Sequence, residues 1–299
     1  MNLYIHSAGC IAPQSPWKHL HEPDYAKVLD PRMLRRMSRV IKMGAAAAMD
    51  AMSRSEVKMP DAIIVGTAYG CLQDTETFLS RMTEQGEQLL TPTAFIQSTH
   101  NTVGAQVALM LGCHGYNNTF VHRGHSFESA LVDAGLLLDE GYGMVLAGGV
   151  DEVTDTSKHL LRRFRVPAGE GAAFFTLSND KAPGALARLT GLRLMRDAPE
   201  ASIVEAAKDM IRLSDTGSDA VDLILHGGAA SALVSAFPDA ERVDYKQFGG
   251  DHPSASAFAL WMAADLMHKG TYQDRPVKKA LVFNSWLDRY TSLFLVEHV

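Results

Sequence analysis

The stretch TFVHRGHSFESALVDAG, residues 119–135, runs from a strand-like segment through a tight turn into a helix of small residues. Thr119, Phe120 and Val121 are β-branched or aromatic, a composition typical of strands. Gly124 lies in the turn, and apolar residues then recur at helical spacing. Many enzymes mount a nucleophile on such a strand, glycine turn and helix. The sequence therefore predicts a nucleophile elbow, although the turn carries no cysteine.

Composition limits the classes of function. The chain of 299 residues is 46% apolar, enough for a large core in one domain or in two fused halves. Its formal net charge of -6 argues against nucleic acid as the main partner, because binding DNA or RNA calls for basic patches. One basic run, LRRFR at 161–165, is expected at the surface. No stretch is apolar enough for a membrane span, and the N-terminus lacks a signal-peptide pattern.

The three cysteines are odd in number and widely spaced. Cys10, Cys71 and Cys113 therefore predict neither a disulfide framework nor a zinc site, and Cys71 and Cys113 are expected to be buried structural thiols. His100 and His298 have no metal-ligand spacing either. We expect a cytoplasmic protein with no metal and no cofactor.

Strand and helix patterns alternate along the chain, which indicates the α/β class with a mixed sheet. Two runs, MVLAGGV and VDLILHG, are almost continuously apolar, as in strands covered by helices on both faces. Helices are expected over 31–54, 99–112, 126–141, 200–213 and 254–269. Strands are expected over 3–9, 62–68, 119–123, 144–150, 172–178, 185–195, 221–227, 242–248, 279–285 and 291–298. The two halves repeat this order, which fits a pseudo-duplicated, layered α/β/α/β/α body.

The order of the motifs resembles that of the β-ketoacyl synthases, which have the thiolase fold. Before the elbow stands PTAFIQSTHNTVGAQVALMLGCHG, and after it follow VLAGGVDEV, AGEGAAFFTLS, LHGG and KQFGGDHPSASAF. NSWLDRYTSLFLVE then occupies the place of the family's Gly-Phe-Gly-Gly loop. The resemblance implies two mixed five-stranded sheets, with residues 1–180 as an N-terminal half that carries the elbow and 181–299 as a C-terminal half.

Condensation in this family requires a cysteine thiolate, whose sulfur takes the acyl chain as a reactive thioester. The thiolate lies at a helix N-terminus, and two histidines assist decarboxylation and stabilise the enolate oxyanion. An ungapped alignment on Thr119, Ala130 and Ala134 puts Gly124 at the cysteine position. A shift by one residue puts His125 there, and neither side chain can hold a thioester.

The two histidine motifs are retained only in part. His226 ends a buried strand as the family's first catalytic histidine does, but the loop after it is shortened. At the second motif Lys246 matches the family's lysine, whereas Asp251 stands at the histidine position and His252 follows it. The bulky turn SWLDRY, residues 285–290, replaces the flexible loop that gates acyl entry. Because such catalytic groups act as a unit, these changes predict a protein that does not condense acyl chains by itself.

Polar residues crowd the elbow and allow several interpretations. Arg123 and Glu128 are expected to belong to a packed polar network, pairing with each other for example. Ser126 could attack an acyl group with His125 or His226 as its base, but its more ordinary role is the helix N-cap.

The elbow also resembles that of ketosynthase-like proteins of aryl polyene and flexirubin-type pigment clusters. That resemblance implies a catalytically silent, chain-length-factor-like subunit of polyene or fatty-acyl biosynthesis. Its partners would be an active β-ketoacyl-ACP synthase, or a second copy of itself, and an acyl carrier protein. One alternative is an enzyme of the same fold with altered chemistry, such as malonyl-ACP decarboxylation or acyl transfer. Another is a plain structural scaffold.

Overall fold

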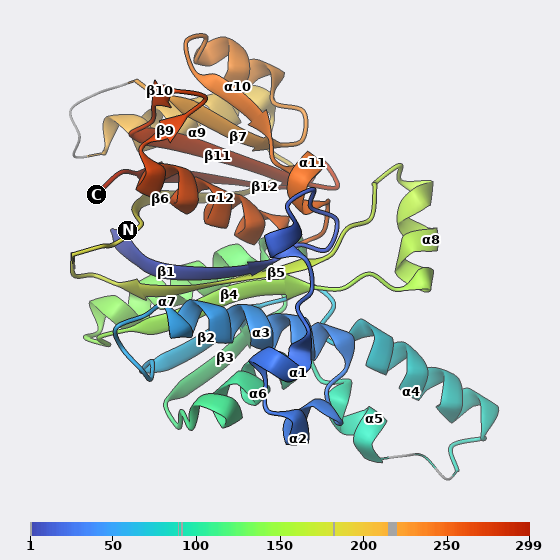
Figure 1. Ribbon diagram of the computed structural model, residues 1–299. Helices are drawn as coiled ribbons and strands as arrows, with labels where there is room; N and C mark the ends of the chain where they lie inside the picture. The colour runs from blue at the N-terminus through green and yellow to red at the C-terminus, as the bar shows by residue number, and fades with distance from the viewer. Residues whose placement is uncertain (1, 89, 91, 182, 215–219) are drawn as a thin grey trace.

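The computed structural model describes residues 2–88, 90, 92–181, 183–214 and 220–299. Within them, ten strands form one sheet in the order β3-β2-β4-β5-β1-β6-β12-β11-β7-β8 (Figure 1). These strands are β1 (Leu3–Ile11), β2 (Ala62–Gly66), β3 (Tyr116–Phe120), β4 (Val145–Asp151), β5 (Gly171–Ser178), β6 (Ala187–Arg196), β7 (Leu223–Gly227), β8 (Glu241–Asp244), β11 (Lys279–Trp286) and β12 (Tyr290–Glu297). A separate small hairpin consists of β9 (Thr271–Tyr272) and β10 (Arg275–Pro276).

The two groups of five strands are continuous, which corrects the expectation of two separate sheets. β1 pairs with β5 over most of its length, and only Leu3, Tyr4 and Ile5 also pair with β6. Leu3 and Ile5 are fully buried, so their backbone groups need partners on both edges of the strand. This short ladder joins the two halves of the sheet.

Helices cover the sheet in layers, as expected for the α/β/α/β/α arrangement (Figure 1). On the outer face of the N-terminal strands lie α3 (Arg39–Ser53) and α6 (Thr102–Leu111). Between the two halves lie α7 (Ser126–Asp139) and α12 (Ala255–Lys269). On the outer face of the C-terminal strands lie α9 (Glu200–Arg212) and α10 (Ser231–Ala236). Three large apolar clusters fill the spaces between these layers.

The remaining helices are short or peripheral. They are α1 (Tyr25–Val28), α2 (Pro31–Leu34), α4 (Leu72–Glu84), α5 (Pro92–Gln97), α8 (Asp155–Arg163) and α11 (Lys246–Gly249), with 3-10 turns at Lys18–Leu20 and Arg123–His125. None of the described helices is long and apolar enough to cross a membrane.

The central layer determines where the elbow lies. α12 is buried on nearly all sides, which fits its high content of Ala, Leu and Met. Gly149 of β4 faces both central helices: a methyl group there would lie 3.0 Å from Cβ of Ala257 and 3.1 Å from Cβ of Phe127. The glycine therefore lets α7 and α12 approach the same strand.

Three expected elements differ in the structure. The strand expected over 119–123 is β3, Tyr116–Phe120, and it ends three residues before the expected end. The helix expected over 31–54 is divided into α2 and α3, because separate N-terminal residues start each one. The Asp30 carboxylate accepts the Arg32 N–H at 2.9 Å to cap α2, and Ser38 adopts an extended conformation before α3. The strand expected over 242–248 ends at Asp244 and continues as α11.

Candidate functional site

The elbow is a tight turn held by Ser126. β3 ends at Phe120, a 3-10 turn spans Arg123–His125, and α7 begins at Ser126. The Ser126 hydroxyl accepts the His122 N–H at 2.9 Å and donates to the Arg123 carbonyl at 2.7 Å. Ser126 therefore fastens the turn before α7 and does not cap the helix, which corrects the N-cap interpretation.

Gly124 lies beneath the tip of the β11–β12 hairpin. A methyl group on Gly124 would lie 2.8 Å from Cβ of Trp286, 2.9 Å from its Cδ1 and 2.8 Å from Cβ of Tyr290. Carbon atoms pack at about 3.5–4.0 Å, so no side chain fits here while the hairpin keeps its place. Trp286 and Tyr290 are themselves buried, at 2% and 7% exposure. We call Gly124, Trp286 and Tyr290 the sealed elbow.

The hairpin tip is the bulky turn expected at 285–290. The Arg289 N–H donates to the Trp286 carbonyl at 3.2 Å, and Leu287 and Asp288 both have φ of 53°. These are the features of a type I′ turn, whose twist suits a short hairpin. The strands thus bring Trp286 and Tyr290 to the same point, directly above Gly124.

Two polar residues of the elbow hold the hairpin. Nη1 of Arg123 donates to the Tyr290 hydroxyl at 2.9 Å. Nε2 of His125 lies 3.1 Å from the Thr291 carbonyl, and its ring meets the Tyr290 ring edge-on at 5.3 Å. Burial lowers the pKa of His125, which favours the neutral ring. Both side chains are therefore engaged in packing the hairpin.

Glu128 is buried and bonds to β12, not to Arg123, so the expected ion pair is not made. Its Oε1 accepts the Ser292 hydroxyl at 2.6 Å, and its Oε2 has no hydrogen-bond partner among the described residues. Asn284 accepts the Tyr245 hydroxyl at 2.6 Å. Burial raises the pKa of Glu128 to about 7, because a charge is costly in this dry interior. The Glu128–Ser292 bond links α7 to β12, and the Tyr245–Asn284 bond links β11 to the residue before α11.

The second histidine motif forms an ion pair beside the hairpin. Nζ of Lys246 lies 2.6 Å from Oδ1 of Asp251 and donates to the Ser285 carbonyl at 2.7 Å. Ser285 immediately precedes Trp286. The Lys246–Asp251 pair and the elbow therefore contact the same hairpin from different elements.

The two remaining histidines of the motifs have different surroundings. His252 is 3% exposed, and its Nδ1 lies 3.2 Å from the Ser254 hydroxyl. A methyl group on Gly171 would lie 3.2 Å from its Nε2, so the ring faces the start of β5. Burial lowers the pKa of His252 to about 3, which keeps it neutral. His226 is half-buried on β7, where its Nδ1 has no hydrogen-bond partner among the described residues.

Buried carboxyl groups at the end of β4 were not recognised in the sequence. Oδ1 of Asp151 accepts the Thr67 hydroxyl at 2.9 Å and the Ala68 N–H at 2.8 Å. Burial raises its pKa to about 6 and that of Glu152 to about 7. The signal was present, since two acids directly follow an apolar run. Within the described ranges, no group of three or more His, Cys, Asp or Glu could hold a metal ion.

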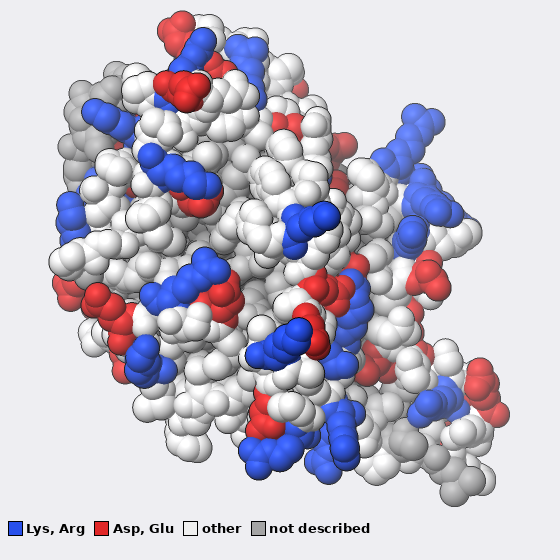
Figure 2. Space-filling model, viewed as in Figure 1, with Lys and Arg blue, Asp and Glu red and all other residues white. Residues whose placement is uncertain are grey.

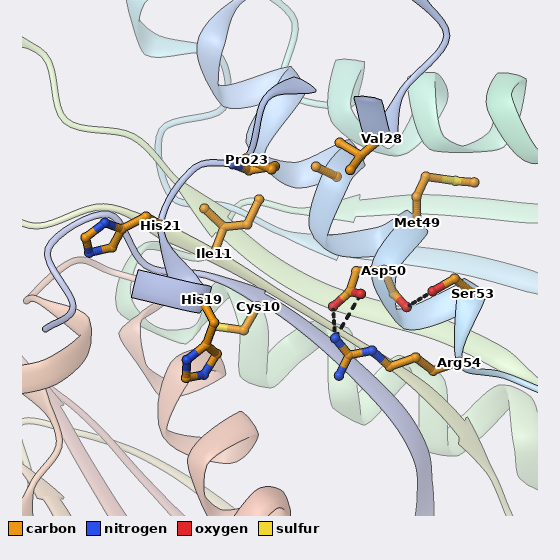
Figure 3. Close-up of a pocket in the computed structure, with 11 residues that line it drawn as sticks. Cys10, Ile11, His19, His21, Pro23, Val28, Met49, Asp50, Ser53 and Arg54 are labelled. Carbon is orange, nitrogen blue, oxygen red and sulfur yellow. Dashed lines mark hydrogen bonds and ion pairs between the residues drawn. The ribbon is translucent and has the colours of Figure 1, made fainter. Parts of the chain in front are cut away.

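A separate cavity of about 390 Å³ lies between β1, the segment before α1 and α3 (Figure 3). An Asp50–Arg54 ion pair of 2.9 Å closes one side, and His19 and His21 lie on the other. Cys10 lines it, and burial raises the pKa of its thiol. None of the motif residues lines this cavity, so it is distinct from the sealed elbow.

Comparison with known proteins identifies the family. The sequence model of the β-ketoacyl synthase N-terminal domain matches residues 11–166, and the chain belongs to this family. No curated protein matches the chain.

Solved structures share the fold across the whole chain. One is a type II polyketide acyl-carrier protein in complex with its ketosynthase, with a TM-score of 0.81, 16% identity and coverage of 100% of this chain and 99% of that one. Another is the ishigamide ketosynthase/chain length factor, with a TM-score of 0.79, 17% identity and full coverage (100%) of both chains. A third is the ketosynthase ApeO in complex with its chain length factor ApeC from Xenorhabdus doucetiae. Its TM-score is 0.77 at 15% identity, and the match covers 100% of this chain and 98% of that one. At these identities the likeness establishes the ketosynthase fold.

Proposed function

We propose that the chain is a catalytically silent, chain-length-factor-like subunit that pairs with an active β-ketoacyl-ACP synthase. The observation that carries this proposal is the sealed elbow. Gly124 supplies no nucleophile, and Trp286 and Tyr290 occupy the space that an acyl thioester would need. In this proposal residues 1–180 and 181–299 are the two halves of one thiolase-like subunit in the cytoplasm.

The other catalytic positions support the absence of condensation. Asp251 stands at a histidine position and pairs with Lys246, so it presents no neutral ring to an enolate. His252 is neutral and faces β5. Ser126 is fully buried with its hydroxyl bonded to the turn, which disfavours acyl transfer through this residue.

An open face on the N-terminal strands supports pairing. β3 is the edge strand of the described sheet, and an unpaired edge can accept a strand from another subunit. Nearby, α6 contacts β3 and exposes Leu109 at 71%. Phe95 and Ile96 of α5, the helix that precedes α6 in the chain, are also exposed, at 58% and 64%. Apolar side chains exposed near an open strand edge are typical of a protein interface.

The occupant of this face in our proposal is a ketosynthase that retains its cysteine. Two of the similar structures are described as ketosynthase and chain length factor together. Aryl polyene or flexirubin-type assembly is the proposed setting, on the resemblance of the elbow segment. A second copy of this chain is the competing occupant.

Co-expression with a ketosynthase that retains its cysteine tests the proposal. We expect one stable 1:1 complex by size-exclusion chromatography with light scattering, and condensing activity that is lost when the partner's cysteine is replaced. A lone homodimer that extends acyl chains would overturn the proposal.

Intact-mass measurement tests the alternative that the chain is an enzyme of the same fold with altered chemistry. After incubation with acyl or malonyl carrier protein, we expect no covalent adduct on this chain. An adduct that maps to Ser126 or His125 would favour acyl transfer instead.

A further inference from the structure

The cavity between β1 and α3 is covered by a segment that is anchored at both ends. This covering segment, residues 20–29, begins and ends with the buried residues Leu20 and Leu29. Between them, Glu22 forms an ion pair with Arg39 at the start of α3. The segment contributes to the lining His21, Pro23 and Val28. Because the segment is held at three points, the cavity has a fixed shape, as small-molecule sites usually have.

The cavity is apolar on one side and polar on the other. Ile11, Val28 and Met49 lie together, and Asp50 and Arg54 lie opposite them (Figure 3). The volume of about 390 Å³ is near the lower end of the range of about 300–1,000 Å³ that is typical of small-molecule sites. The cavity therefore suits a small ligand with an apolar body and a polar head.

The polar side presents both signs of charge. Nη2 of Arg54 lies 2.9 Å from Oδ2 of Asp50 and 3.0 Å from its Oδ1. A guanidinium has several N–H donors and a carboxylate has several acceptor positions, so this ion pair leaves bonding capacity on both groups. The Ser53 hydroxyl donates to the Asp50 carbonyl at 2.8 Å and does not compete for the carboxylate. The pair can thus bind an anionic and a cationic group of one ligand.

Charges of opposite sign are also mixed around the cavity. On the face of the molecule where α1 and α3 lie, basic and acidic side chains lie next to one another, and the surface is hollowed near its middle (Figure 2). Arg39, for example, pairs with both Glu22 and Glu170. A lone carboxylate bound to Arg54 would also meet the like charge of Asp50, and a lone amine bound to Asp50 would meet the guanidinium. A head group that carries both charges avoids this repulsion.

We propose that the cavity binds a small zwitterion with an apolar side chain, of the class of free amino acids. Its carboxylate accepts from Arg54, and its ammonium group donates to Asp50. Its side chain lies against Ile11, Ala46 and Met49, and an aromatic ring gains from contact with the Met49 thioether. The site is independent of the proposed function, because its lining residues differ from the catalytic positions of the family.

Isothermal titration calorimetry with three related compounds tests the site. L-Phenylalanine carries both charges, 3-phenylpropanoate lacks the ammonium group, and phenethylamine lacks the carboxylate. With the full wild-type chain we expect saturable 1:1 binding of L-phenylalanine. The other two compounds should bind about tenfold more weakly or worse, because each loses one charge-assisted bond and faces one like charge.

Two variants assign the contacts of the head group. D50N should weaken binding of L-phenylalanine about tenfold but leave 3-phenylpropanoate bound no more weakly, since the carboxylate that repels it is gone. R54Q should weaken L-phenylalanine to a similar degree but leave phenethylamine bound no more weakly, for the corresponding reason.

D265N is the matched control. Asp265 pairs with Lys269 at the same spacing on α12, and both lie outside the residues that line the cavity. The two ion pairs are alike in side-chain exposure, 37% and 60% for this pair and 41% and 62% for the Asp50–Arg54 pair. The Kd of D265N for L-phenylalanine should stay within about twofold of the wild-type value.

Three results would overturn the inference. They are the absence of saturable L-phenylalanine binding, equal affinity for the three compounds, and losses in D50N and R54Q no larger than in D265N. The comparison of the three compounds uses the wild-type chain, so misfolding of a variant leaves the test decisive. Pairing with a ketosynthase is measured separately, and failure of amino-acid binding does not bear on it.

Discussion

Replacing Gly124 with alanine tests whether the hairpin fills the nucleophile's place. The new methyl group would meet three carbon atoms at 2.8–2.9 Å, and all three belong to the Cβ or ring of packed side chains. Overpacking of this kind costs about 1–3 kcal/mol, and we expect about 3 kcal/mol because Cβ atoms move only with the backbone. Urea unfolding followed by circular dichroism measures the loss.

A second variant tests whether contact with Trp286 causes the destabilisation by G124A. W286G removes two of the three contacts, so G124A should cost only about 1 kcal/mol in that background, a coupling of about 2 kcal/mol. G143A is the control, because this exposed glycine meets only the end of the Asp61 carboxylate at 3.2 Å. Equal costs of G124A in both backgrounds would refute the sealed elbow.

Three further predictions concern the same region. G124C should give no acyl adduct with acyl carrier protein by intact mass, because the hairpin blocks its thiol; a stoichiometric adduct would contradict this. The raised pKa of Glu128 means that the folded state holds its proton up to about pH 7, so its contribution to stability falls as pH rises from about 4.5 to 7. Between pH 5 and pH 8 the free energy of unfolding of E128Q should therefore rise by about 2.5 kcal/mol relative to that of the wild type, as measured by urea unfolding. Parallel pH profiles of the two proteins would contradict this prediction. K246M should cost about 3 kcal/mol because it leaves the Asp251 carboxylate mostly buried without its cation, and K246M/D251N should recover part of that loss.

Local sequence signals predicted much of the fold. The helix expected at 126–141 is α7, Ser126–Asp139, because its apolar spacing is regular and Gly141 follows it. The apolar run at 144–150 is β4, Val145–Asp151, because a continuous apolar run suits a strand buried on both faces. The family resemblance implied the layered arrangement with two separate sheets. The short β1–β6 ladder joins these two groups of strands into one continuous sheet.

Long-range contacts at the site could not be predicted. The bulk of the 285–290 turn was visible in the sequence, but its contact with Gly124 depends on where two distant elements meet. Arg123 and Glu128 are close in the sequence, yet Arg123, which has a positive φ, donates to Tyr290, and Glu128 accepts from Ser292. The short helix α8 was not predicted from the sequence, because its polar composition resembles that of a loop.

The double pairing of β1 has a consequence for how the chain folds. β1 is translated long before β5 and β6, yet its hydrogen-bond partners lie at residues 172–178 and 187–189. Neither edge of the strand can therefore be satisfied until residues 172–189 have left the ribosome. During that interval its apolar residues are open to chaperones and to aggregation, which makes early synthesis the vulnerable stage for this protein.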